Sequence, residues 1–233
     1  LLELNAQGFL NGHTPFSAVV AFLSYYCAYL VGANHIVLSN EASANAPNIE
    51  GSTVNHQYSK SYEFERDFRE FTKRNLVGEI KYFSMLRPFN ELQIAKEFAD
   101  LPRFHGIFRS CNRGSKQHIW CGECAKCLFV YSILSPFLDN ERLTEIFGSD
   151  LFTKEHLGNE LDGLNGVIKL KPFECVGTVE EVAAALNETV RIYEQQGKAL
   201  PALLRRHKES FSANPPYEVP DIKQVLSYYN SEH

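Results

Sequence analysis

The chain has 233 residues, which suffice for one ordinary core or for one domain with a smaller appendage. Hydrophobic residues make up 44% and charged residues 22%, as in soluble proteins, and no apolar run approaches the roughly 20 residues that span a bilayer. The net charge of -5 provides no basic face for a phosphate backbone. Composition therefore predicts a globular protein whose partner is neither a membrane nor a nucleic acid, and it leaves the oligomeric state open.

The cysteines indicate the compartment of the protein, and the first residue indicates how the chain relates to the translated protein. Six cysteines are too few for a disulfide scaffold at this length, and three of them cluster, which favours metal binding in a reducing compartment. We therefore predict a cytoplasmic protein. The chain begins at Leu1 and its only methionine is Met85, so we expect a fragment or a processed form.

The first half of the chain alternates helix and strand. Thr14 and Pro15 have the cap-then-proline order that opens a helix, and the apolar stretch 16–31 predicts a buried helix with Cys27 in its core. Helix and strand alternating at this spacing predict an α/β fold, a parallel sheet with helices on both faces. The predicted strands are 35–41, 80–85 and 106–111, and the predicted helices between them are 61–76 and 90–101.

The second half is predicted to be helical. A capping box, Thr178 with Glu181, opens the last of its long helices, and an irregular tail begins at Asn214. The predicted helices are 125–138, 140–147 and 178–196.

Polar side chains mark the ends of the predicted strands. Ligands of open parallel sheets bind beyond the carboxyl ends of the strands, so these side chains are candidates to contact a ligand. They are Ser39, Asn40 and Glu41 after the first strand, Arg87 after the second, and Arg109 with Cys111 at the third.

The strongest local motif is a set of four cysteines, Cys111, Cys121, Cys124 and Cys127. Their spacing predicts a structural zinc site, because zinc prefers four soft or borderline ligands at tetrahedral corners. Four sulfur ligands leave no open coordination position, so the metal is expected to stabilise structure and not to activate water. The alternatives are buried free cysteines with a chance spacing, or His118 in place of one cysteine.

A dense polar loop, containing Asn55, His56 and Lys60, precedes the predicted helix at 61–76. Backbone amides at a helix start attract carboxylate or phosphate, which makes the loop a candidate site. The alternative is a solvated loop in which Ser59 or Ser61 caps the helix.

Other candidates are weaker. His13 is either a ligand contact or a local hydrogen-bonding partner of the first helix cap. Single carboxylates in the chain are acids or bases of a site, or surface groups, and Cys175 is expected to be a buried thiol. The common phosphate-binding glycine loops and the hydrolase elbow are absent from the sequence. The carboxylates in question are Glu41, Glu91 and Glu174.

Several motifs together resemble the UDP-N-acetylmuramoyl-L-alanyl-L-glutamate epimerase family of bacterial peptidoglycan synthesis. The resemblance runs in order from about residue 10 to residue 180. The cysteine spacing also resembles the zinc knuckle of 7-cyano-7-deazaguanine synthase, with one extra residue between the first two cysteines. The motifs are Asn-Gly-His-Thr-Pro at 11–15, Ser-Asn-Glu at 39–41, the loop 54–61, Leu-Arg-Pro at 86–88, the segment 120–127 and the segment 171–177.

The resemblance implies an adenine nucleotide alpha-hydrolase-like fold and an ATP-dependent inversion of the terminal glutamate of a nucleotide-linked muramoyl dipeptide. Magnesium is implied as a cofactor, and AMP and pyrophosphate as products. An acyl adenylate makes the α-proton of glutamate far more acidic than a carboxylate does, so ATP use and inversion suit one site. Relatives carry a glycine-rich phosphate loop ahead of the region seen here, and its absence leaves independent activity of these 233 residues in question.

Residue roles follow from the resemblance as hypotheses. His56 or Lys60 moves the α-proton, and Arg87 and Arg109 hold the substrate carboxylate or the phosphates of ATP. The remaining candidates line the substrate or nucleotide pocket or reach magnesium. They are His13, Ser39, Asn40, Glu41 and Asn55.

The resulting division of the chain has three parts: a partial nucleotide-hydrolase-like α/β domain at 1–115, a zinc knuckle at 111–130 and a helical C-terminal region at 131–233. Two other functions stay open. One is another ATP pyrophosphatase, such as a ligase or amidase acting on a carboxylate. The other is a non-catalytic binding module held together by zinc.

Overall fold

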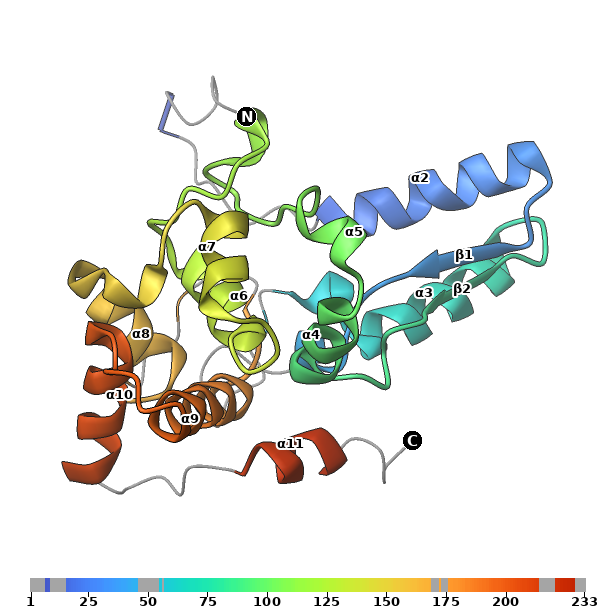
Figure 1. The fold of residues 1–233 in the computed structure, drawn as a ribbon. Helices are drawn as coiled ribbons and strands as arrows, with labels where there is room; N and C mark the ends of the chain where they lie inside the picture. The colour runs from blue at the N-terminus through green and yellow to red at the C-terminus, as the bar shows by residue number, and fades with distance from the viewer. Residues whose placement is uncertain are drawn as a thin grey trace.

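The structure is a computed structural model that describes residues 7–8, 16–45, 55, 57–168, 172, 176–213 and 221–228. Two parts lie side by side, as Figure 1 shows. The first, called here the sheet lobe, consists of α2, β1, α3 and β2. The second, called the helical body, runs from α4 to α11.

Two parallel strands form the sheet. β1 (His35–Leu38) pairs with β2 (Lys81–Ser84), and the register runs from His35 opposite Lys81 to Leu38 opposite Ser84. The connection between them includes α3 (Tyr62–Asn75) and the short 3-10 helices η1 (Ala42–Asn45) and η2 (Tyr58–Lys60). The first two predicted strands, and their parallel order, are therefore confirmed. In the described part of the chain the sheet has no third strand.

One face of this sheet is covered and the other is open. Ile36 and Leu38 of β1, and Tyr82 of β2, pack against side chains of α2 and α3. The ring of Phe68 on α3 lies 4.6 Å from the ring of Tyr82. On the opposite face Val37 is 50% exposed. The prediction of helices on both faces is wrong here, because α2 and α3 pack on the same face.

The helix α2 (Phe16–Val31) occupies the predicted segment but is not a buried helix. Only Ala21, Tyr25 and Ala28 are buried, a spacing that places a single stripe of the helix against the lobe. Cys27 is exposed. The prediction of a buried helix, with Cys27 in the protein core, is therefore wrong. The segment is apolar on all sides, and the described residues cover only one side of the helix.

The next two helices begin where their capping residues predict. Ser61 caps α3 by accepting a hydrogen bond from the amide of Phe64. Asn90 and Gln93 form a reciprocal capping box at the start of α4 (Glu91–Ala99). The predicted helices at 61–76 and 90–101 are confirmed.

The predicted strand at 106–111 forms no strand. α5 (Pro102–His105) follows α4, and the chain then passes through turns toward the cysteines. The ring of Phe108 lies 4.5 Å from that of Phe98 and 5.1 Å from that of Trp120. Phe108 thus packs against Phe98 of α4 and Trp120 of the cysteine loop, whereas Ile107 is 71% exposed. An apolar run alone does not distinguish this packing from a strand.

Six further helices complete the helical body. The predictions for 140–147 and 178–196 are confirmed, and the helix predicted at 125–138 ends at Leu134, shortly before Pro136. Within the described residues, no helix has the length and apolarity that crossing a membrane requires. The helices are α6 (Ala125–Leu134), α7 (Asn140–Phe147), α8 (Gly158–Leu164), α9 (Val179–Gln195), α10 (Ala202–Ala213) and α11 (Ile222–Tyr228).

The main core lies in the helical body, with α9 at its centre. α9 contacts α4, α6, α10 and α11, and its Leu186 is fully buried. Its first turn carries Glu181, which is 1% exposed. The Glu181 carboxylate accepts hydrogen bonds from the amide of Thr178 at 2.5 Å and from the amide of Glu91 at 2.7 Å. One buried carboxylate therefore caps both α9 and α4.

Candidate metal centre and sheet-end site

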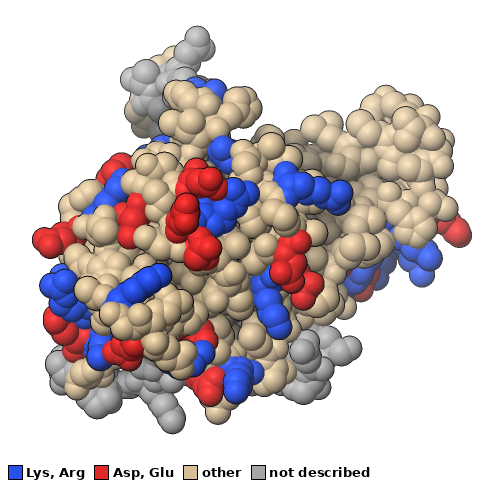
Figure 2. Space-filling view, viewed as in Figure 1, with Lys and Arg blue, Asp and Glu red and all other residues tan. Residues whose placement is uncertain are grey.

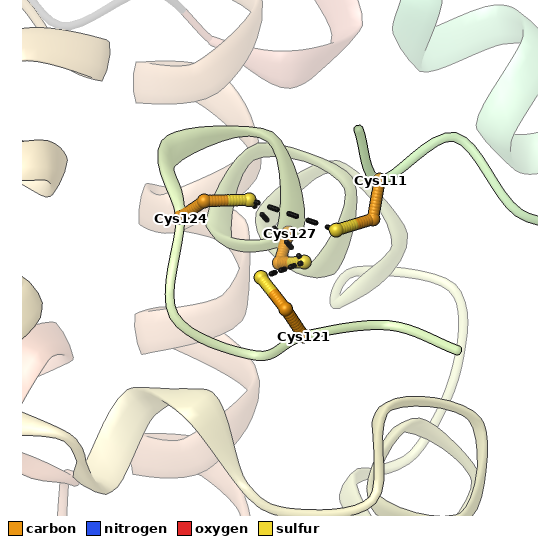
Figure 3. Close-up of side chains that lie close together, drawn as sticks. All are labelled: Cys111, Cys121, Cys124 and Cys127. Atoms are coloured by element: carbon orange, nitrogen blue, oxygen red, sulfur yellow. Dashed lines mark hydrogen bonds between the residues drawn. The ribbon is translucent and has the colours of Figure 1, made fainter. Parts of the chain in front are cut away.

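The four cysteines converge at the start of α6, as Figure 3 shows. Cys111 comes from the turns after α5, Cys121 from the loop before α6, and Cys124 and Cys127 from the first turn of α6 and its cap. Their sulfur atoms all lie within 4.8 Å of one another. The predicted convergence of these four residues is confirmed. His118, the alternative ligand, is exposed and is not part of the cluster.

The distances between the sulfur atoms suit a tetrahedral metal. They are 3.9 Å from Cys111 to Cys124, 3.7 Å from Cys121 to Cys127 and 3.5 Å from Cys124 to Cys127. A tetrahedron with zinc–sulfur bonds of ~2.3 Å has sulfur–sulfur edges of about 3.8 Å. The cluster can therefore hold a metal ion with four sulfur ligands and little movement.

Electrostatics favour a cation among these sulfurs. Burial raises the pKa of Cys121 to about 11. The hydrogen bond with Cys124, together with burial, raises the pKa of Cys127, and the matching hydrogen bond lowers the pKa of Cys124 to about 5. Without a metal the group thus holds one thiolate easily and resists further ionisation. A divalent cation removes that resistance by neutralising the added charge.

Two glycines shape the chain around the sulfurs. Gly122 has a φ of +65°, in the left-handed region, between Cys121 and Cys124. A Cβ atom at Gly114 would lie 2.1 Å from the carbonyl oxygen of Ile119, so no larger residue fits there without a shift of the backbone. The amide of Gly114 also donates to the sulfur of Cys111 at 3.3 Å.

Two side chains from the segment after α7 contact the turn at Gly122 and Glu123. Lys154 Nζ donates to the carbonyl oxygen of Gly122 at 3.0 Å and to Glu123 Oε1 at 2.5 Å, and His156 Nε2 lies 2.5 Å from Glu123 Oε2. The hydrogen bonds from Lys154 and His156 lower the pKa of Glu123. Sequence reasoning missed Lys154 and His156, since they follow the cysteines by about thirty residues and share no motif with them.

A second polar cluster, the Arg87 cluster, lies at the carboxyl end of the sheet. Arg87 Nη1 donates to the carbonyl oxygen of Glu41 at 3.0 Å, and Nη2 donates to the carbonyl oxygen of Lys60 at 2.8 Å. Asn40 Nδ2 donates to Ser84 Oγ at 3.2 Å. The structure thus brings together Asn40, Glu41 and Arg87, as expected of residues that follow neighbouring parallel strands, and it adds Lys60 from the end of η2.

The charge of Arg87 is matched inside this cluster. Its guanidinium lies 3.2 Å from Glu65 Oε2, and both side chains are largely buried. Burial and the neighbouring Glu65 raise the pKa of Tyr82 to about 12, against the opposing effect of Arg87. Sequence reasoning missed Glu65. The available signal was its place on the buried stripe of α3, where Arg69 follows at i+4 and also pairs with it.

Other predicted site residues are placed as follows. Asn55 Nδ2 donates to the carbonyl oxygen of Ala44 at 2.8 Å, close to the Arg87 cluster along the chain, and Ser39 is exposed just after β1. Arg109 does not follow a strand. It donates to the carbonyl oxygens of Phe108 and His118, within the loop that carries Cys111. The predictions for four residues lie outside the described part of the chain: His13, His56, Glu174 and Cys175.

Comparison with known proteins identifies the family. The MurL N-terminal domain model matches residues 1–85, and the MurL C-terminal domain model matches residues 107–216. The chain belongs to the MurL family. The resemblance seen in the motifs is thereby confirmed for both halves of this MurL-family chain.

Curated relatives of the MurL-family chain carry one name, UDP-N-acetyl-alpha-D-muramoyl-L-alanyl-L-glutamate epimerase. The one from Xanthomonas oryzae pv. oryzae is 41% identical over 194 residues, which are 80% of this chain and 43% of the relative. The one from Salinispora tropica is 40% identical over 194 residues, 80% of this chain and 42% of the relative. The chain thus spans less than half the length of these relatives. No solved structure matches it.

Proposed function

We propose that the full-length protein inverts the terminal L-glutamate of UDP-N-acetylmuramoyl-L-alanyl-L-glutamate to D-glutamate, in the cytoplasmic stage of peptidoglycan synthesis. The observation that carries the proposal is the match to curated relatives named as this epimerase, at 40–41% identity over 80% of the chain. The two family models, which together span both halves of the chain, support it.

The proposed chemistry uses ATP to activate the substrate. The glutamate carboxylate attacks the α-phosphorus of ATP, pyrophosphate leaves, and an acyl adenylate forms. A base removes the α-proton, which the adjacent acyl adenylate has made more acidic, and a proton returns to the opposite face. Water then cleaves the adenylate to release AMP and the D-glutamate product. Magnesium would neutralise phosphate charge, and the carboxylate of Glu41 is of the oxygen type that it prefers.

The Arg87 cluster is the proposed wall of the active site in this chain. Its position at the carboxyl ends of two parallel strands is where open α/β sheets bind ligands. Arg87 already donates to two backbone carbonyls and pairs with Glu65, so its proposed role is to position the segments of Glu41 and Lys60. His56 or Lys60 is proposed to move the α-proton, and Arg109 to contact the substrate from the cysteine loop.

Zinc is the proposed occupant of the cysteine site, with a structural role. Three observations support it: the sulfur–sulfur distances of 3.5–3.9 Å, the burial of three of the cysteines, and the four-sulfur donor set, which suits zinc. Cys111, Cys121, Cys124 and Cys127 would fill its coordination, so it would supply no catalytic group. Its effect would be to join the loop of Arg109 to α6.

The test of the activity is an incubation of the full-length protein with ATP, magnesium and the L-glutamate dipeptide nucleotide, followed by hydrolysis and chiral analysis of the glutamate. The proposal expects D-glutamate together with AMP and pyrophosphate. Absence of D-glutamate would remove it, and D-glutamate formed equally well without ATP would remove the adenylate.

The proton role is tested separately with deuterium uptake from solvent at the glutamate α-carbon. Variants His56→Gln and Lys60→Met are compared with Lys73→Met, an exposed lysine on α3 that serves as a matched control. We expect one of the first two variants to lose uptake by about 100-fold or more, while the control retains it. Full uptake in both His56→Gln and Lys60→Met would rule out either residue as the base.

A further inference from the structure

The exposed side of α2 in the sheet lobe is apolar, and none of the residues that the structure describes covers it. α2 contains no charged residue, and nine of its large hydrophobic side chains are exposed, among them Leu23 at 58% and Leu30 at 63%. Figure 2 shows the upper part of this lobe as free of Lys, Arg, Asp and Glu, whereas charged side chains lie along its lower edge and over the helical body. Proteins that act as monomers rarely leave an apolar surface of this extent in water.

The sheet against which α2 packs also lacks neighbours in the described part of the chain. Among the described residues β1 pairs with β2 alone, and parallel sheets are ordinarily covered on both faces. The carbonyl oxygens of Asn34 and Leu38 accept hydrogen bonds from Lys81 and Met85, so the even-numbered residues of β1 direct their backbone groups toward β2. The alternation of a strand then directs those of His35 and Val37 toward the opposite, free edge.

The position of α2 indicates what fills that edge. α2 contacts β1 and packs on the same face as α3, which contacts β2 (Figure 1). α3 connects β1 to β2, the strand beside it, and packs against β2. In the same way α2 precedes β1 in the chain and packs against β1. Crossover connections in one sheet keep one handedness, so a strand joined to β1 through a helix on this face lies along the free edge of β1.

We propose that this surface, formed by the free edge of β1, the exposed side of α2 and the open face around Val37, is the docking site for a further part of the same polypeptide. That part would contribute at least one parallel strand beside β1 and an apolar layer over α2. The curated relatives support this occupant, because more than half of their length lies outside the match, and the lobe lies within the segment matched by the N-terminal domain model. The alternative occupants are a second copy of the chain and no polypeptide at all.

Hydrogen exchange in the full-length protein tests the strand. The amides of His35 and Val37 face the free edge, and those of Ile36 and Leu38, which face β2, are the internal controls. The proposal expects all four amides to be protected to a similar degree. Exchange of His35 and Val37 that is about tenfold or more faster than that of the controls would overturn it.

Alkylation of Cys27 tests the cover over α2 and identifies its source. Cys27 is exposed in this chain, whereas Cys111, Cys124 and Cys127 are buried. In the full-length protein we expect Cys27 to react about tenfold or more slowly than a cysteine placed on α10 by Glu209→Cys, at every protein concentration. Protection that disappears on dilution would assign the surface to a second copy, and equal reactivity of the two thiols would leave it uncovered. Either result overturns the proposal, and neither depends on epimerase activity.

Discussion

The helical body and the sheet lobe bury their apolar residues to very different degrees. The body encloses leucines such as Leu128, Leu161 and Leu186 with no exposure, and it also contains the cysteine site. The lobe has a small cluster in which Tyr25, Phe68 and others meet, under a helix that is mostly exposed. The sheet lobe thus forms its helices and strands around little enclosed core, so stability in this chain should depend mainly on the helical body.

The largest effect that would test this contrast is loss of the metal. Cys127→Ser removes a fully buried sulfur of the proposed zinc site. We expect the variant to fail to bind zinc and the helical body to be destabilised by more than about 5 kcal/mol, since the binding free energy of a structural zinc is ~10–16 kcal/mol. Metal analysis and urea unfolding followed by circular dichroism measure both. Cys27→Ser, at an exposed position, should change neither. An unchanged midpoint in Cys127→Ser would show that the metal does not stabilise the body.

Within the lobe, the largest single contribution is expected from the pairing of Arg87 with Glu65. Arg87→Ala leaves a buried carboxylate with Arg69 as its remaining partner, and we expect a loss of about 3–5 kcal/mol in the free energy of unfolding of the lobe. The matched control is Arg74→Ala, which breaks the exposed pair with Glu70 and should cost less than about 1 kcal/mol. Equal effects in urea unfolding would mean that the Arg87 cluster does not hold the lobe together.

A pair of leucines compares packing in the two parts directly. Leu186→Ala in α9 should destabilise the chain by about 2–5 kcal/mol, because it opens a cavity in a closed core. Leu23→Ala in α2 removes a side chain that is already 58% exposed, and the cost should stay below about 0.5 kcal/mol in the 233-residue chain. Similar costs for the two variants would show that α2 is covered in solution.

The last effect concerns the pH dependence of the free energy of unfolding, and it belongs to the helical body. Burial lowers the pKa of His207 to about 4 from 6.5, and Asn165 and Asn187 hold its two ring nitrogens. The unfolded chain binds a proton to this residue below pH 6.5 and the folded chain does not, so its contribution is present above that pH and is lost as pH falls toward 4, by roughly 3 kcal/mol in all.

The variant His207→Gln isolates this contribution from the protonation of the cysteines. We expect the difference in unfolding free energy between the wild type and the variant to shrink as pH falls from 7 to 4, in paired urea titrations. A difference that stays constant over this range would assign the acid sensitivity to other groups.

Local signals were enough to predict much of the fold. Ser61 caps α3, as one interpretation of its loop predicted, and α4 begins at the predicted position. The spacing of the cysteines identified all four members of the cysteine cluster. These predictions succeeded because each depends on contacts within a few residues or on a rigid ligand geometry.

The failures share a different cause, which is that burial depends on partners far away in the sequence. Nothing in the segment of α2 shows which of its apolar sides is covered. The run around Phe108 has the composition of a strand, but Phe108 packs against the rings of Phe98 and Trp120. The contacts of Lys154 with the cysteine loop and of Glu65 with Arg87 span more than twenty residues and follow no repeat. Such pairings appear only once the chain is folded.

The carboxylate of Glu181 has a consequence for how this protein can be divided. It accepts from the first amide of α4, which lies 90 positions away in the sequence, and from the cap of α9, which lies three positions away. A boundary drawn just before residue 107, where the second family match begins, therefore separates segments that share one buried anion, whereas a boundary after residue 85 keeps them together. A fragment that ends before α9 would leave the start of α4 without this acceptor, and one that begins after α4 would bury the Glu181 carboxylate without the amide of Glu91 as a donor. A fragment of this protein should therefore keep α4 and α9 together.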